Sequence, residues 1–318
     1  MVSHEERNKN ITENNEKVYG RDIPNETRRL PLPKHSCYGI VIDKLRICYD
    51  GTNNNNIEDL KKVQICQVKT MVGFHFLRTT HDCFEYNYAV YDKDDKAVAT
   101  LRFSKYVNKT APSVLVYLEV YNEVLYKPDR LKELLLMPEM IGLTFHNFTA
   151  IDLAVDSPFN VTTIIRKMMK DESVDTIINR KVVKDRSTVL EGLTCTHSIT
   201  INKLKNPTIT IKQKKAQKHV SDGVTVQAYN KKEEIMNASD KQYIMDYWDN
   251  PKRLYRLEVR LHNEDIKAFL SHELITPSID ILYNSAQLKE MFLFHLNSVI
   301  RFRFGRHIIN WRDILGMQ

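Results

Sequence analysis

The sequence lacks two features that would place the chain in a membrane or in an oxidising compartment. A spanning helix needs roughly 20 consecutive apolar residues, and no segment approaches that length. The five cysteines are scattered and none are spaced as C-x-x-C, which disfavours a zinc ribbon or a disulfide framework. The N-terminal stretch is polar, without the apolar centre of a signal peptide. We therefore expect reduced thiols, a cytoplasmic protein and no membrane partner.

Internal repeats and an aromatic-rich strand of the kind used by RNA-binding sheets are also missing. What is present is a large apolar fraction, 42%, which predicts a globular fold. The formal net charge is +7, and a basic chain suits an anionic partner such as nucleic acid. Charge alone also fits a membrane surface.

The hydrophobic patterning predicts an α+β fold with a largely antiparallel central sheet flanked by helices. We expect a flexible arm over 1–36, a main α+β domain over 37–275, and a helical C-terminal extension over 276–318. Pro138 is expected to interrupt a helix that starts near Pro128. Strands are expected at 38–49, 72–78, 83–91, 97–106, 113–121, 148–156, 194–202, 207–213, 223–230 and 253–262, and helices at 57–67, 159–170 and 232–248, with a mainly helical tail from 263.

Four of these strands pair an apolar face with a polar face, because successive side chains of a strand point to opposite sides. The polar faces carry Glu119, the pair Asp152 and Asp156, Glu258, and Tyr229. An ordinary sheet with one solvated face explains any single strand. Acidic residues are poor strand formers, however, and clustered carboxylates repel one another unless a cation lies between them. Several on one surface suit Mg²⁺ or Mn²⁺.

The order of three of these segments, IDLAVD, YNKKEE and YRLEVRL, resembles the replication initiators of staphylococcal-type rolling-circle plasmids. That family is related to conjugative relaxases and to the wider HUH endonucleases, so the resemblance implies an HUH-endonuclease-like fold. It covers roughly residues 110–270. The chain departs from the family pattern where Ala150 and Ala228 stand near usual arginines, and where HSITIN replaces a glycine-containing strand. It also has no His-hydrophobe-His pair; His146 and His197 are isolated.

The resemblance implies that Tyr229 nicks one DNA strand, forming a 5′-phosphotyrosine and a free 3′-OH. Asp152, Glu119, Asp156 and Glu258 then fall on positions that form or support a site for Mg²⁺ or Mn²⁺. A tyrosine with an ordinary pKa needs activation at neutral pH, and the adjacent Lys231 and Lys232 could favour the phenolate or hold a phosphate. Without the resemblance, amphipathic packing is the ordinary explanation of such a tyrosine. The alternative nucleophiles are Tyr243, Tyr247 and Tyr255.

The implied partners are origin DNA, single-stranded or extruded as a hairpin, and the helicase and polymerase of a bacterial host; a homodimer stays open. Residues 161–220 hold 13 Lys and Arg against 5 Asp and Glu. Within them we expect a basic hairpin that contacts phosphates. Its lysines are Lys203, Lys205, Lys212, Lys214, Lys215 and Lys218.

Three other functions stay open at the level of sequence. A conjugative relaxase would use the same chemistry with other partners. A DNA-binding regulator could have lost nicking, as the departures at Ala150 and Ala228 allow. An RNA-binding protein is the third. The C-terminal segment RFRFGRHIINWR interleaves arginines with aromatic residues, which fits either base stacking or packing of Phe302, Phe304 and Trp311 in a terminal helix.

Overall fold

The computed structural model describes residues 32–33, 35–51, 55–107, 114–183, 192–193, 197–201, 208–213 and 223–317. It confirms a mixed α+β fold with a large antiparallel sheet. That sheet has 12 strands in the order β10-β11-β12-β13-β14-β7-β1-β6-β5-β4-β3-β2. A second sheet has four strands in the order β16-β15-β8-β9. All neighbouring strands in the larger sheet run antiparallel.

The described part of the chain holds 16 strands and 10 helices. The strands are β1 Gly39–Gly51, β2 Val68–Met71, β3 Phe74–Thr79, β4 Phe84–Tyr91, β5 Ala97–Val107, β6 Val114–Val120, β7 Leu143–Ser157, β8 Val174–Ile178, β9 Lys181–Val182, β10 Gly192–Leu193, β11 His197–Ile201, β12 Ile209–Gln213, β13 Thr225–Asn230, β14 Tyr255–His262, β15 Ile300–Phe304 and β16 His307–Ile309. The helices are α2 Asn55–Lys62, α3 Asn122–Leu125, α4 Pro128–Met140, α5 Val161–Lys170, α7 Lys231–Ala238, α8 Gln242–Tyr247, α9 Asn263–His272, η2 Ile279–Tyr283, α10 Ser285–Val299 and α11 Trp311–Leu315.

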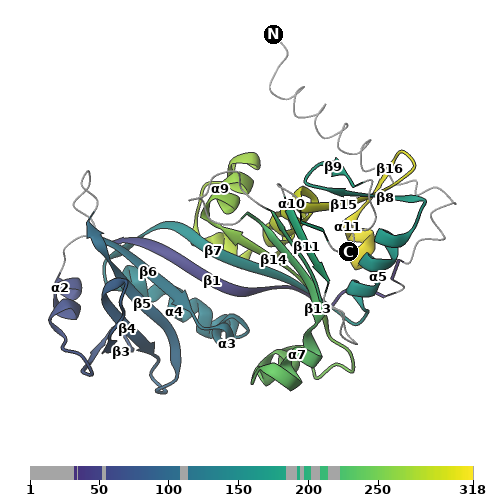
Figure 1. Ribbon diagram of the computed structural model, residues 1–318. Helices are drawn as coiled ribbons and strands as arrows, with labels where there is room; N and C mark the ends of the chain where they lie inside the picture. Colours follow the sequence, from purple (N-terminus) through teal and green to yellow (C-terminus); the bar gives the residue numbers. More distant parts are fainter. Residues whose placement is uncertain are drawn as a thin grey trace, which may run out of the picture.

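The large sheet is a twisted platform with helices on both faces (Figure 1). Helix α10 crosses one face and contacts β1, β7, β12, β13 and β14. Its side chains Phe292 and Leu296 are fully buried there. The alternating apolar residues of β7, Ile151, Leu153 and Val155, are buried as the sequence pattern predicts.

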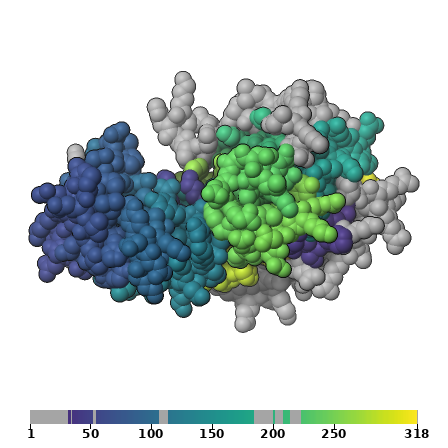
Figure 2. All heavy atoms as spheres, turned by 90° about the horizontal axis from the view of Figure 1, so that it is seen from below, coloured from purple at the N-terminus to yellow at the C-terminus, as the bar shows by residue number. Residues whose placement is uncertain are grey.

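Helices α3, α4 and α7 lie on the opposite face of the platform (Figure 1). Viewed from that side, strands β2–β5 form one end of the molecule and α7 and α8, in green, lie nearer its middle, with α3 and α4 between them (Figure 2). Helix α7 begins directly after β13, where the Asn230 side chain caps it by accepting a hydrogen bond from the backbone N–H of Glu233 at 3.2 Å. The polar faces of the central strands therefore lie under a partial cover of helices.

Several local expectations were wrong. The 232–248 region holds two helices, α7 and α8, separated by residues 239–241. Pro138 does not interrupt α4, which runs on to Met140. It lies in the last turn, where the helix ends two residues later at Met140. The stretch before 194, which has little periodicity, contains β8 and β9.

The tail from residue 263 also differs from the helical expectation, because RFRFGRHII forms the hairpin β15–β16. Strand β15 pairs with β8, so residues more than 120 positions apart complete the small sheet. Phe302 and Trp311 are both fully buried, and the Trp311 indole N–H donates to the carbonyl of Ile300 at 2.9 Å. Both aromatic side chains therefore pack in the core, and Phe302 does so from a strand instead of the expected helix.

One hydrophobic core extends from Val41 to Leu315. The four cysteines that the structure describes, at positions 37, 48, 66 and 83, are free thiols. In the described ranges, no helix combines the length and the apolar character needed to cross a membrane. The expected N-terminal arm lies almost entirely outside the described residues.

Candidate functional site

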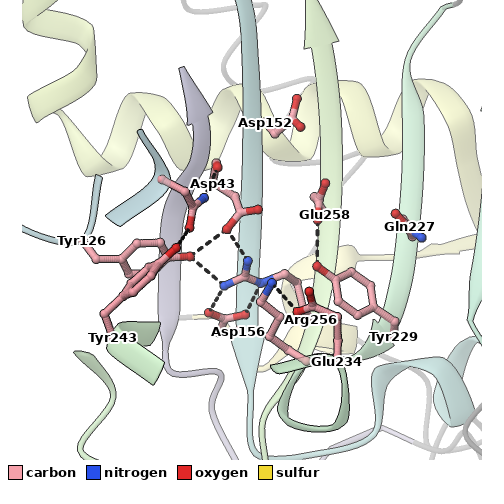
Figure 3. Close-up of polar contacts among 12 residues, drawn as sticks. Asp43, Tyr126, Asp152, Asp156, Gln227, Tyr229, Glu234, Tyr243, Arg256 and Glu258 are labelled. Carbon is pink, nitrogen blue, oxygen red and sulfur yellow. Dashed lines mark hydrogen bonds and ion pairs between the residues drawn. The ribbon is translucent and has the colours of Figure 1, made fainter. Parts of the chain in front are cut away.

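The polar residues of three adjacent strands meet on the sheet face opposite α10. In the register of β13 and β14, Gln227 is opposite Glu258 and Tyr229 is opposite Arg256. In that of β14 and β7, Arg256 is opposite Asp156 and Arg260 is opposite Asp152. Antiparallel register thus brings residues that are about 100 positions apart in the chain into contact. Figure 3 shows Gln227, Tyr229, Arg256, Glu258, Asp152 and Asp156 on this face of the sheet.

Tyr229 is held by a carboxylate of the neighbouring strand. Its hydroxyl donates to Glu258 Oε2 at 3.0 Å, while Arg260 Nε donates to Glu258 Oε1 at 2.7 Å. Burial raises the pKa of Tyr229 well above its ordinary value, and the negative charge of Glu258 adds to that rise while Arg256 opposes it. The tyrosine is therefore a neutral phenol whose proton already points at a carboxylate (Figure 3).

The two lysines after Tyr229 make different contacts from each other. The Lys231 side chain is almost fully buried; its ammonium group lies 2.8 Å from Glu234 and 5.6 Å from the centre of the Tyr229 ring. Burial lowers the pKa of Lys231. The Lys232 ammonium donates to the backbone carbonyls of Pro251 and Lys252, at 3.1 and 3.3 Å. Lys231 thus lies near the face of the Tyr229 ring, and Lys232 connects α7 to the loop before β14.

Asp152 and Glu258 form the acidic part of the site. Burial and, after it, the nearby charge of Glu258 raise the pKa of Asp152 to about 7, against the opposing charge of Arg260. The nearest ion-pair contact of Asp152 is to Arg260 Nε at 3.8 Å, longer than a hydrogen bond. Two carboxylates in one buried region repel each other, so a proton or a cation stabilises them.

The other two expected metal ligands form ion pairs with arginines. Glu119 contacts Arg46 at 3.0 Å and Arg102 at 2.8 Å. Although partial burial opposes it, these two guanidinium groups lower the pKa of Glu119. Asp156 is fully buried, with both oxygens accepting from Arg256 at 2.7 Å and one accepting from the indole N–H of Trp248 at 2.8 Å.

Arg256 is the residue of this site that the sequence reasoning did not single out. It is fully buried and forms ion pairs with both Asp156 and Asp43, and it donates to the Tyr126 hydroxyl at 2.8 Å. Asp43 is the extra residue of a β-bulge, since Ile42 pairs with Leu153 and Lys44 with Asp152. Simple alternation along β1 gives no signal for that bulge. Although burial opposes ionisation, Arg256 holds the pKa of Asp43 well below its ordinary value.

A pocket of about 460 Å³ opens beside these groups. It crosses β14, β7, β1, β6 and β5, which are neighbours in that order. Glu258, Asp152 and Glu119 all face it, although they come from three different strands. Its other lining residues are Asp43, Lys44, Thr100, Arg102, Val120, Tyr121, Asn122, Lys241 and Arg260.

The expected basic hairpin is described only in part. Lys212 lies on β12 and is exposed. Lys203, Lys205, Lys214, Lys215 and Lys218 lie outside the described residues. Of the two isolated histidines, His146 contacts Asp50 at 2.9 Å through Nδ1. The side chain of His197 is outside the described part.

In the described part of the chain, no three His, Cys, Asp or Glu side chains are arranged to hold a metal ion by themselves. Comparison of the chain with protein-family models, with curated proteins and with solved structures finds no match.

Proposed function

We propose that this protein nicks one strand of DNA by transesterification at Tyr229 and thereby initiates rolling-circle replication. The observation that carries the proposal is the 3.0 Å hydrogen bond from the Tyr229 hydroxyl to Glu258. A nucleophile next to a proton acceptor, which is itself held by a third group, is the arrangement that activates weak nucleophiles. Here the third group is Arg260, at 2.7 Å from Glu258. An HUH-endonuclease-like fold is part of the same proposal.

The proposed step conserves atoms and charge. The Tyr229 oxygen forms a bond to the phosphorus of a phosphodiester, and the bond from phosphorus to the 3′ oxygen breaks. The phenol proton passes to Glu258, the departing 3′ oxygen takes up a proton from solvent to become the free 3′-OH, and Glu258 returns its proton to solvent. The 5′-phosphate stays on Tyr229, so the strand can be rejoined by the reverse reaction.

A divalent cation fits this site only in part. Asp152 and Glu258 line one pocket and supply carboxylate oxygens of the kind that Mg²⁺ and Mn²⁺ prefer. Both of these ions commonly retain water and substrate oxygens as ligands, so two protein carboxylates are a workable donor set. A bound cation would stabilise negative charge on the phosphoryl oxygens. In this proposal Glu119 and Asp156 do not bind the cation, because they are already paired with arginines. They stabilise this face of the sheet instead.

The proposed partners follow from the same chemistry. The substrate is origin DNA, single-stranded or extruded, and the 3′-OH that is released serves a polymerase and helicase of a bacterial host. A conjugative relaxase would carry out the same step with other partners. A regulator that binds DNA without nicking is the main competitor, because burial keeps the Tyr229 phenol neutral.

Covalent capture separates a nicking enzyme from a regulator without knowledge of the origin sequence. Full-length protein is incubated with a random pool of single-stranded DNA and MnCl₂, and then denatured in detergent. DNA that stays attached to protein is sequenced, and the attached peptide is identified by mass spectrometry. We expect an adduct on Tyr229 that disappears in Tyr229→Phe protein and in EDTA.

Tyr247→Phe is the matched control. The Tyr247 side chain is 43% exposed on α8 and packs edge-on against the Tyr126 and Trp248 rings. The substitution keeps the ring and removes a hydroxyl, as at Tyr229. This variant should form adducts at the wild-type level. Undiminished adduct formation by Tyr229→Phe protein would overturn the proposal, and an absence of adducts in wild-type protein would favour the regulator.

A further inference from the structure

Two lysines of the pocket beside Tyr229 form no close ion pair with a carboxylate of the described residues, and Lys44 interacts electrostatically with Asp152 only beyond ion-pair distance. Lys44 follows the bulge of β1, and Lys241 lies directly before α8, so they approach the pocket from different elements. Within the described part of the chain, no ion pair joins either ammonium group to an acidic side chain. They are available for a negative group from outside the protein.

The other charges that line this pocket are largely balanced by one another. Glu119 is paired with two arginines, Glu258 with Arg260, and Asp43 with Arg256. Asp152 lies 3.8 Å from Arg260. Arg256 also pairs with Asp156, so five carboxylates face four arginines in this network. Lys44 and Lys241 bring the sum of these charges to +1, and the pocket can receive an anion.

The shape of the pocket fits an extended ligand. At about 460 Å³ it is in the usual range for sites that take small molecules or a nucleotide. It crosses five neighbouring strands, a width of roughly 19 Å at the ordinary spacing between strands. At roughly 3.4 Å per stacked nucleotide, that width accommodates several nucleotides of a single strand.

One buried polar group of the pocket also lacks a hydrogen-bond partner among the described residues. The Thr100 hydroxyl, on β5, is buried and has no hydrogen-bond partner among the described residues. A buried hydroxyl without a partner is uncommon in proteins and is satisfied when a ligand supplies the missing group. At the other end the pocket reaches Glu258, the residue that accepts the Tyr229 hydrogen bond.

We propose that this pocket binds the backbone of a single DNA strand, with Lys44 and Lys241 contacting its phosphates. A strand bound in this way passes Glu258 and presents a phosphodiester to Tyr229. The inference rests on the proposed nicking function for the identity of the ligand. Both lysines lie outside the basic 161–220 segment, so they define a contact region separate from it.

The test is a binding measurement on protein that cannot cleave. Tyr229→Phe protein is titrated against a fluorescein-labelled 12-nucleotide oligothymidine, and anisotropy gives the dissociation constant at several NaCl concentrations. Each lost phosphate contact on a single strand lowers the slope of log K against log salt by about 0.7. We expect Lys44→Ala/Lys241→Ala to lower that slope by about 1.4 and to weaken binding at least about tenfold at low salt.

Two controls decide whether the charge and its position matter. Lys132→Ala removes an exposed lysine of α4 that does not line the pocket, and it should leave the slope unchanged. Lys44→Arg/Lys241→Arg keeps both charges and should retain most of the slope. An unchanged slope in the double alanine variant overturns the inference. So does equally strong competition by a hexaglutamate peptide, because that result would assign the pocket to acidic proteins.

The outcome is separable from that of the nicking proposal. If the slope falls as expected but wild-type protein forms no covalent adduct, the pocket binds single-stranded DNA and the nicking proposal fails. If adducts form on Tyr229 while the slope does not depend on Lys44 and Lys241, the nicking proposal stands and this inference fails.

Discussion

Arg256 and Asp156 form a fully buried ion pair between β14 and β7, with two hydrogen bonds of 2.7 Å. Removing one member of such a pair leaves an uncompensated charge in the interior, which typically costs about 3–5 kcal/mol. We expect Asp156→Asn to lower the free energy of unfolding by that amount. Arg256→Met should cost more, because it leaves both Asp156 and Asp43 without their cation.

Urea denaturation measures both variants. The control is Asp175→Asn, which removes the pair between Asp175 and Arg303, whose side chains are 44% and 38% exposed. A solvent-exposed pair contributes about 0–1 kcal/mol, so this variant should be nearly neutral. Equal costs for Asp156→Asn and Asp175→Asn would contradict the structural role of the Arg256 pair.

Replacing Asp152 should raise the stability of the protein at alkaline pH, whereas replacing Asp156 should lower it, although both residues lie on the same face of β7. The pKa of Asp152 is raised from 3.8 to about 7, so the folded protein binds a proton that the unfolded chain releases above pH 4. Stability therefore falls as pH rises from about 4 to 7. Asp152→Asn should remove this loss and raise stability at pH 8 by on the order of 4 kcal/mol, a three-unit shift.

Thermal melts in EDTA at pH 4 and pH 8 check this expectation. The melting temperatures of wild-type and Asp152→Asn protein should be similar at pH 4 and differ at pH 8. MnCl₂ at pH 8 should stabilise the wild type only, if the cation binds through this carboxylate. A variant that is less stable than the wild type at pH 8 would show that Asp152 is not a strained, buried carboxylate.

Glu258→Gln separates proton transfer from hydrogen bonding. The amide oxygen of glutamine can still accept the Tyr229 hydrogen bond, but it cannot take up the proton. Loss of a general base typically slows a reaction by about 10²- to 10⁴-fold, and we expect a fall of that size in the initial rate of adduct formation. Glu133→Gln, at an exposed position of α4, is the control, and an equal rate in both variants would remove Glu258 from the mechanism.

The C-terminal region should be required for folding. Trp311 is fully buried and its indole donates to the Ile300 carbonyl. Truncating a buried aromatic side chain to alanine typically costs about 3–5 kcal/mol, so we expect that loss in Trp311→Ala protein. Leu274→Ala, at a side chain that is 88% exposed, should be close to neutral. A chain that ends at residue 275 and still melts cooperatively at the wild-type temperature would show that the region is a separate extension.

Much of the central sheet could be predicted because its strands carry their own signal. In β7 and β14 the alternation of apolar and polar residues indicates a strand and which face is apolar, but the polar face is largely buried as well. The hairpin of β15 and β16 carries a mixed signal, since RFRFGRHII alternates like a strand but follows a long apolar helix. Whether this segment forms a strand depends on its pairing with β8. In that pairing Ile300 is opposite Ile178, which is 122 residues earlier in the chain.

The sequence by itself determined the polar and apolar faces of the strands, the position of Tyr229 at a strand end, and the order of the acidic segments, because these are local properties of the chain. Only the tertiary structure decided which charges meet. Strand register pairs Asp156 with Arg256, the β1 bulge adds Asp43, and Glu258 rather than a lysine contacts the Tyr229 hydroxyl. Four carboxylates that look equivalent in sequence differ because each charge depends on its spatial neighbours and its burial.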